Sequence, residues 1–186
     1  MSHDNAAPGF YLGDSPHANY VIAHNVSFRN EYGIFVRHSA HGLVTQNTVW
    51  GNCVGVLFLD DGQPGGEHDL ALTSNRALAN NKACPPEDEG PPPLSGIGVA
   101  WIGVRHSIAA HNVIRNNVPS GSTAFSGGFV LLSAASLTGG SNSMNDRIVR
   151  NRLFGNSPVD ILWDQAGTGN VFAGNHCGAS SPSGLC

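Results

Sequence analysis

Val21-Ile22-Ala23-His24-Asn25 is a short apolar run that ends on an asparagine, and a second asparagine, Asn30, follows five residues later. The same arrangement recurs along the chain in the pairs Asn47/Asn52, Asn75/Asn80, Asn112/Asn117 and Asn151/Asn156, and Asn175 opens a sixth turn. The distances between successive first asparagines are 22, 28, 37, 39 and 24 residues. Self-similarity at a period of a few tens of residues predicts a repeat architecture.

Each second asparagine precedes a short strand-like segment, which begins with glycine in four repeats: Gly33-Ile34-Phe35-Val36, Gly55-Val56-Leu57-Phe58, Gly96-Ile97-Gly98-Val99 and Gly128-Phe129-Val130-Leu131. Short alternating runs bounded by glycine and asparagine favour strands over helices. Because such strands cannot bury their apolar side chains alone, the repeats must stack around a shared core. The sequence predicts an all-β solenoid of about six coils, with a ladder of stacked asparagines at Asn25, Asn47, Asn75, Asn112, Asn151 and Asn175.

These segments resemble those of right-handed parallel β-helix proteins of the pectate-lyase-like superfamily. The residues that carry the resemblance are Val21–Asn25, Leu43–Asn47 and Ile108–Asn112 together with the strands that follow them, and it extends over about residues 17 to 177. The resemblance implies a right-handed parallel β-helix and a carbohydrate-associated function, because polysaccharide lyases, glycoside hydrolases, uronan epimerases and sugar-binding repeats dominate this superfamily.

The repeat pattern divides the chain into three parts. Residues 17–177 are expected to form the β-helix, and residues 178–186 a C-terminal tail. Residues 1–16 are expected to be an N-terminal extension or a lid over the first coil. Their apolar residues Phe10, Tyr11 and Leu12 are candidates to cover an apolar face of the solenoid.

Composition excludes several function classes. Only 12% of the residues are charged, and nine Lys plus Arg against thirteen Asp plus Glu leave no basic stripe for nucleic acid. No run of apolar residues is long enough for a transmembrane helix, so no membrane partner is expected. The first residues also lack the apolar segment of a signal peptide.

Four cysteines nevertheless indicate an oxidising compartment and a secreted protein. Cys177 and Cys186 flank the tail, and Cys53 and Cys84 lie in neighbouring coils, which stack at about the Cα separation that a disulfide requires. An even number of cysteines without a Cys-x-x-Cys motif favours two disulfides over a metal site. The expected pairs are Cys53–Cys84 and Cys177–Cys186, and reduced, buried cysteines are the alternative.

Four insertions interrupt the repeats, and loops on a rigid scaffold are where binding and catalysis concentrate. Two follow the second asparagine, at residues 81–95, which include Glu87, Asp88 and Glu89, and at residues 118–126. Two follow the apolar strand, at residues 60–67 and 134–143. Because they come from adjacent coils, they are expected to crowd one region and wall a groove, with tolerated decoration as the alternative.

Stacking the strands in register aligns Ile34, Val56, Ile97, Phe129 and Ile161 and predicts one polar column at the following turn: His38, Asp60, Trp101, Ser133 and Gln165. Asp60 and Asp61, with His38 and Arg37, are the candidate catalytic residues, because a carboxylate beside a histidine can transfer protons. Trp101, Glu67 and Asp164 are the candidate substrate-binding residues, since aromatic faces beside carboxylates suit sugars. Ordinary turn chemistry is the alternative reading of Asp60-Asp61-Gly62.

No cofactor or metal site is predicted. Ca²⁺ is the only ion that the acidic residues are suited to bind. The expected partner is a polysaccharide or an oligosaccharide. The sheet face that carries Phe35, Leu57, Leu59, Val130, Leu132 and Leu162 is apolar, which is typical of a covered surface or a homo-oligomer interface. The second hypothesis is therefore a non-catalytic structural or interaction protein that associates through this face or through its open first coil.

Overall fold

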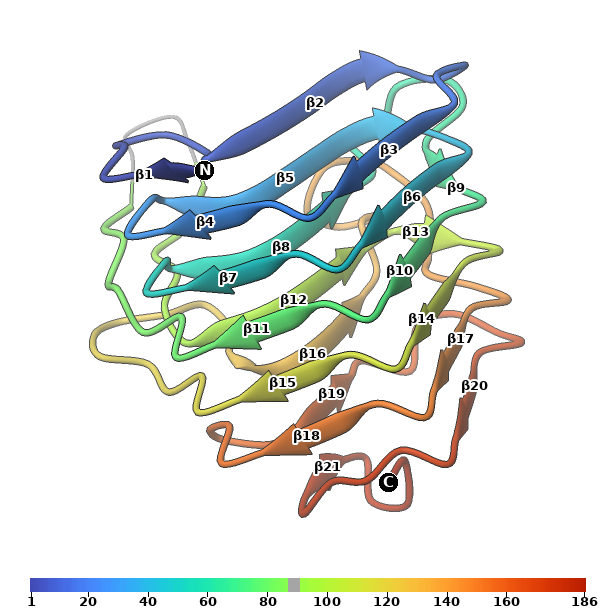
Figure 1. Ribbon diagram of the computed structural model, residues 1–186. Helices are drawn as coiled ribbons and strands as arrows, with labels where there is room; N and C mark the ends of the chain where they lie inside the picture. The colour runs from blue at the N-terminus through green and yellow to red at the C-terminus, as the bar shows by residue number, and fades with distance from the viewer. Residues whose placement is uncertain (87–90) are drawn as a thin grey trace.

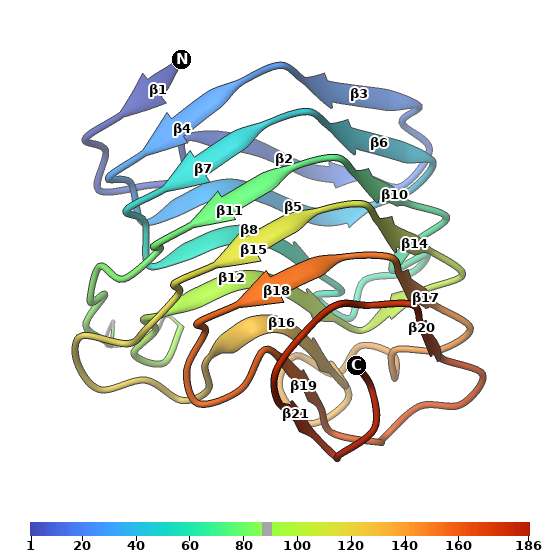
Figure 2. The same cartoon turned by 60° about the horizontal axis from the view of Figure 1, so that its bottom comes forward.

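The computed structural model describes residues 1–86 and 91–186, so the acidic residues Glu87, Asp88 and Glu89 of the first insertion lie outside the described part of the chain. The chain winds into a solenoid of stacked coils, with the N-terminus at one end and the C-terminus at the other (Figure 1). Each coil contributes one strand to each of three sheets, and all strand pairs in these sheets are parallel (Figure 2). No described segment forms a helix long and apolar enough to cross a membrane.

The largest sheet has seven strands and carries the residues discussed below. Its order along the stack is β2 (Phe10–Ser15), β5 (Tyr32–Ser39), β8 (Val54–Leu59), β12 (Ile97–Ile102), β16 (Gly127–Leu132), β19 (Ile161–Trp163) and β21 (Ser180–Ser181).

Two six-stranded sheets complete each coil. One contains β3 (Tyr20–Ala23), β6 (Gly42–Thr45), β10 (Ala71–Thr73), β14 (Ile108–Ala110), β17 (Arg147–Val149) and β20 (Val171–Ala173). The other contains β1 (Ser2–His3), β4 (Val26–Phe28), β7 (Thr48–Trp50), β11 (Arg76–Leu78), β15 (Val113–Arg115) and β18 (Arg152–Phe154). A separate pair, β9 (Glu67–His68) and β13 (Val104–Arg105), lies at the turn after the largest sheet.

Asparagine side chains form two ladders along the stack. The backbone N–H of Asn47 donates to Oδ1 of Asn75 at 2.9 Å, and the Nδ2 of Asn47 donates to the same oxygen at 3.0 Å. This donor-to-next-coil bonding runs from Asn25 to Asn175, as the sequence predicts. A second ladder runs through the second asparagines, from Asn5 to Asn156, and ends on the carboxylate of Asp160.

The residue before each ladder asparagine turns the chain. At the first ladder these residues are His24, Gln46, Ser74, His111 and Arg150, with φ angles between 54° and 59°. At the second ladder they are Arg29, Gly51, Ala79, Asn116 and Gly155, with φ angles between 46° and 66°. One left-handed residue per corner ends the strand and redirects it. The shared position of His24 and His111 is thus a consequence of turn geometry.

The interior of the solenoid is filled by the inward side chains of all three sheets. The third coil differs from the expected register: Val99, not Ile97, pairs with Val56 and Phe129. The two-residue shift moves Trp101 from the turn into the core, where it is fully buried and meets Phe58 and Phe129 edge-on. The 81–95 insertion ends just before Gly96. The repeat spacing does not predict the length of this insertion, and therefore does not predict the register of β12.

The two ends of the solenoid differ. Residues 1–16 are not a lid, because β1 and β2 pair with β4 and β5 as another coil. The tail is attached by the Cys177–Cys186 disulfide, whose Cα atoms are 5.3 Å apart, and by pairing of β21 with β19. Cys53 and Cys84 form the other expected disulfide, with Cα atoms 5.9 Å apart.

The apolar outer face of the seven-stranded sheet is covered by two insertions rather than by the N-terminal segment. Leu94 and Phe125, from the insertions at 81–95 and 118–126, pack there with Leu57, Ala100 and Val130. The backbone of Cys84 pairs with that of Leu94, and Ala124 donates to the carbonyl of Pro93. The insertions therefore form two groups instead of one: this pair precedes β12 and β16, whereas residues 60–67 and 134–143 follow β8 and β16.

Candidate functional site

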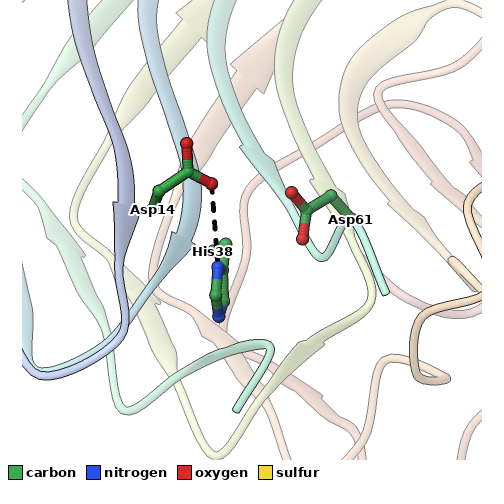
Figure 3. Close-up of side chains that lie close together, drawn as sticks. All are labelled: Asp14, His38 and Asp61. Atoms are coloured by element: carbon green, nitrogen blue, oxygen red, sulfur yellow. Dashed lines mark ion pairs between the residues drawn. The ribbon is translucent and has the colours of Figure 1, made fainter. Parts of the chain in front are cut away.

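Four charged or ionisable side chains meet at the carboxyl edge of the seven-stranded sheet. Asp14 comes from β2, Arg37 and His38 from β5, and Asp61 directly follows β8, so three neighbouring coils contribute. Because the strands are parallel and in register, their carboxyl ends bring these residues together. Figure 3 shows Asp14 and Asp61 on either side of His38. We refer to Asp14, Arg37, His38 and Asp61 as the edge cluster.

The Arg37 guanidinium links the two carboxylates of the edge cluster. Its Nη2 donates to both oxygens of Asp14, at 3.0 and 3.3 Å, and its Nε lies 3.4 Å from Oδ2 of Asp61. About a third of the Arg37 side chain remains exposed, against 62% for Asp14 and 16% for Asp61. The positive charge is thus held between two negative charges while one side of the guanidinium faces solvent.

His38 is almost buried, and its two ring nitrogens have different surroundings. Nε2 lies 2.9 Å from the carbonyl oxygen of Pro64, which can only accept, so Nε2 carries a proton. Nδ1 is buried, has no hydrogen-bond partner among the described residues, and lies 3.8 Å from Oδ1 of Asp14. In the neutral ring this tautomer leaves the Nδ1 lone pair available to accept a proton.

The edge cluster also matches the donor types of a cation site. One ligand atom each from Asp14, His38 and Asp61 lies within 4.8 Å of the others. Ca²⁺ takes six to eight oxygen ligands, however, and both carboxylates already pair with Arg37. The residues present therefore fit an acid–base cluster better than a calcium site.

Asp60 lies next to this cluster in sequence but has a structural role. It is 1% exposed, and its Oδ1 and Oδ2 accept hydrogen bonds from the backbone N–H groups of Gly62 and Ser141, at 3.0 and 2.9 Å. Its carbonyl oxygen accepts from the hydroxyl of Thr138. Asp60 thereby ties the 60–67 insertion to the 134–143 insertion, and both of its oxygens are occupied. The catalytic role expected for Asp60 therefore finds no support in its surroundings.

Two candidate substrate-binding residues are buried. Trp101 has no exposed surface, so it cannot present a ring face to a sugar. Glu67 is also fully buried; its Oε2 accepts from the Ser39 N–H at 2.8 Å, and its Oε1 lies 3.3 Å from the Ser39 hydroxyl. Burial raises the pKa of Glu67 well above its ordinary value. A separate polar column at this turn runs through Ser107, Asp146 and Asn170.

Asp164 is exposed but lies away from the edge cluster. It follows β19, four strand spacings from β5, or about 19 Å along the stack. Its two oxygens accept from the backbone N–H groups of Ser133 and Ala166, at 2.6 and 2.9 Å. Any ligand that reaches both Asp164 and His38 must therefore extend across several coils.

Sequence reasoning missed Asp14. Residues 1–16 precede the first asparagine pair, so the repeat pattern gave them no register. The available signal was the alternation of Phe10-Tyr11-Leu12 before Asp14, which matches Ile34-Phe35-Val36 before Arg37 and His38. Among the residues proposed for catalysis, the structure brings together Arg37, His38 and Asp61.

Comparison with known proteins agrees with this architecture. Residues 2–184 match the family described as the right-handed beta helix region, and the chain belongs to that family. Among solved structures, it is similar to a double mutant of the periplasmic alginate epimerase AlgG, with 15% sequence identity and a TM-score of 0.61. The similarity covers 94% of this chain and 39% of the AlgG chain, so this chain spans about two fifths of that protein. No curated protein matches the sequence.

Proposed function

We propose that this protein acts on an acidic polysaccharide outside the cytoplasm, by proton abstraction at the edge cluster. The observation that carries the proposal is the adjacency of the buried, unpartnered Nδ1 of His38 and the guanidinium of Arg37, about a third of whose side chain is exposed. Similarity to an alginate epimerase supports a uronate-containing substrate. The two disulfides support an oxidising compartment, extracellular or periplasmic.

Abstraction of a proton from the carbon next to a sugar carboxylate needs two groups. A base must take the proton, and a cation must neutralise the carboxylate as negative charge moves onto it. Nδ1 of His38 supplies the base, and the solvent-facing side of Arg37 supplies the cation. The resulting carbanion either expels the neighbouring glycosidic oxygen, which takes a proton, or is reprotonated from the opposite face. The first outcome is a lyase reaction, and the second is an epimerase reaction.

Glycoside hydrolysis fits the edge cluster less well. A hydrolase needs one carboxyl group that keeps its proton near neutral pH and one that is ionised. Asp14 and Asp61 both pair with the Arg37 guanidinium, so neither is placed as a free proton donor. The acids whose pKa burial raises, Glu67 and Asp146, are fully buried and out of reach of a substrate.

The test is turnover of alginate and polygalacturonate by the wild type, His38→Asn and His111→Asn. Both histidines have positive φ angles, 48° and 59°, which asparagine tolerates, so the two substitutions are matched in backbone cost. Ultraviolet absorbance detects the unsaturated product of a lyase, and exchange of the ring proton with deuterium detects epimerisation. We expect His38→Asn to lower the rate about a hundredfold or more and His111→Asn to leave it unchanged. Equal rates in both variants would refute the assignment.

An interaction role without catalysis remains the second candidate, and the first coil favours it. The strands β2 and β3 pair on one side only, and Tyr11 and Val21 on them are 52% and 67% exposed. Absence of binding and turnover with every polysaccharide, together with concentration-dependent self-association, would favour this candidate.

A further inference from the structure

A hollow of about 300 Å³ lies between the two insertions that follow the seven-stranded sheet. It is lined by the glycine-rich segments around residues 62–66 and 139–141, and by Asp60 and Arg105. Gly66 and Gly140 keep it open, because a β-carbon at either position would approach Asp60 within 2.8 Å. The hollow adjoins the edge cluster: His38 bonds to the carbonyl of Pro64, and Gly65 lines the hollow.

Arg105 brings to the hollow a positive charge that makes no ion pair with a described carboxylate, although Asp60 also lines the hollow. Its Nη2 donates to the carbonyl oxygen of Gly65 at 2.7 Å, and its Nε is buried without an acceptor among the described residues. No described Asp or Glu lies within 4 Å of its guanidinium nitrogens, whereas Arg29 and Arg37 each have such a partner. A guanidinium carries five donors, and most of those on Arg105 are unused.

The backbone around the hollow adds further donors. Within the described residues, the N–H groups of Gly65, Gly139 and Gly140 donate to no acceptor. The carboxylate of Asp60 also faces this region, but its two oxygens are held by the N–H groups of Gly62 and Ser141. Arg105 and these unused N–H groups can donate to an oxyanion.

We propose that this hollow binds the oxyanion of a charged saccharide, a carboxylate or a sulfate ester, with Arg105 as its anchor. The proposal rests on the proposed function for the identity of the polymer, and it assigns one charged sugar unit to the hollow while another lies at His38. Such a second contact fixes the position of the polysaccharide along the coils of the protein. Neutral polysaccharides lack the group that the hollow is built to hold.

Titration calorimetry with sodium glucuronate, sodium sulfate and glucose tests the proposal on the wild type and three variants. Arg105→Gln removes the anchor, and Arg147→Gln is the control, because Arg147 is exposed on β17 and has no partner in the described structure. Arg105→Lys keeps the charge but not the planar donor set. Thermal unfolding of each variant establishes that it folds.

We expect one of the two anions to bind the wild type and Arg147→Gln with equal affinity, and to bind Arg105→Gln about tenfold more weakly, as loss of a charge-assisted hydrogen bond implies. Arg105→Lys should fall between them, and glucose should not bind. The anion that binds more tightly identifies the group. Absence of anion binding, or equal binding by Arg105→Gln, overturns the proposal. The polysaccharide assays with His38→Asn are separate, so either conclusion can fail without the other.

Discussion

Oδ1 of Asn112 accepts two hydrogen bonds from Asn75, one from its backbone N–H at 2.9 Å and one from its Nδ2 at 3.1 Å. The Nδ2 of Asn112 in turn donates to the carbonyl of Leu72 and to Oδ1 of Asn151, both at 2.9 Å. One buried side chain therefore satisfies polar groups in three successive coils. Asn25 lies in the first coil, and no other described residue donates a hydrogen bond to its Oδ1.

This difference predicts unequal costs of removing ladder asparagines. Asn112→Ala leaves the Asn75 N–H and the Leu72 carbonyl without partners in a buried site, so it should lower the free energy of unfolding by about 3 kcal/mol. Asn25→Ala removes no hydrogen bond made by the side chain and should cost less than about 1 kcal/mol. Urea unfolding of both variants measures the difference. Equal costs would show that the ladder does not stabilise the fold.

Substitutions at two corner positions of the second ladder are predicted to change stability in opposite directions. Ala79 and Gly51 occupy the same place in neighbouring coils, with φ angles of 46° and 66°. Because alanine is strained at positive φ and Ala79 is exposed, Ala79→Gly should stabilise the protein by about 0.5–1 kcal/mol. Gly51→Ala should destabilise it by a similar amount. Chemical denaturation of the two variants measures both changes, and a stability loss in Ala79→Gly would contradict the turn argument.

Asp146 predicts a pH dependence of stability. Burial raises its pKa from 3.8 to about 8, although Oδ1 accepts from the Ser107 N–H and so favours ionisation in part. Between about pH 4 and pH 8 the folded protein holds this proton and the unfolded chain does not, so the contribution of Asp146 to stability falls as pH rises through this range. Asp146→Asn should remove that fall and raise stability at pH 8 by on the order of a few kcal/mol.

Thermal or urea unfolding between pH 4 and pH 9 provides the measurement for Asp146→Asn. Asp69→Asn is the control, because Asp69 is an exposed carboxylate at a neighbouring turn. Asp69→Asn should keep the slope of the wild type. If stability depends on pH in Asp146→Asn as steeply as in the wild type, Asp146 is ionised in the folded protein.

The burial of Trp101 predicts that its loss affects folding before binding. Trp101→Ala removes a fully buried indole that contacts Phe58 and Phe129, and should cost about 3–5 kcal/mol. Trp50 is 38% exposed and stacks on Phe28 at 4.5 Å, so Trp50→Ala should cost about 1 kcal/mol. Calorimetric melting compares them. A Trp101→Ala protein of wild-type stability would contradict the register described here.

Periodicity predicted the fold because successive coils repeat the same local chemistry: a pair of corner asparagines five residues apart and one alternating strand. It predicted less of the site, since the site depends on where insertions end. The 81–95 insertion shifted the register of β12 by two residues and moved Trp101 inward. Asp60 and Asp61 are adjacent in sequence, yet one is bonded on both oxygens and the other is free to face Arg37, and only the folded insertions decide which.

The bonds between ladder asparagines have a direction, because each runs from the N–H donors of one asparagine to Oδ1 of the asparagine in the next, C-terminal coil. These asparagine-to-asparagine bonds therefore all point the same way from the first coil to the last. Asp160 matches this polarity, since a carboxylate accepts both bonds offered by Asn156 at the end of the second ladder. If two such solenoids met through their first coils, the hydrogen-bond acceptors of one ladder would face the acceptors of the other. Growth by duplication of a coil, in contrast, always presents a donor to an acceptor.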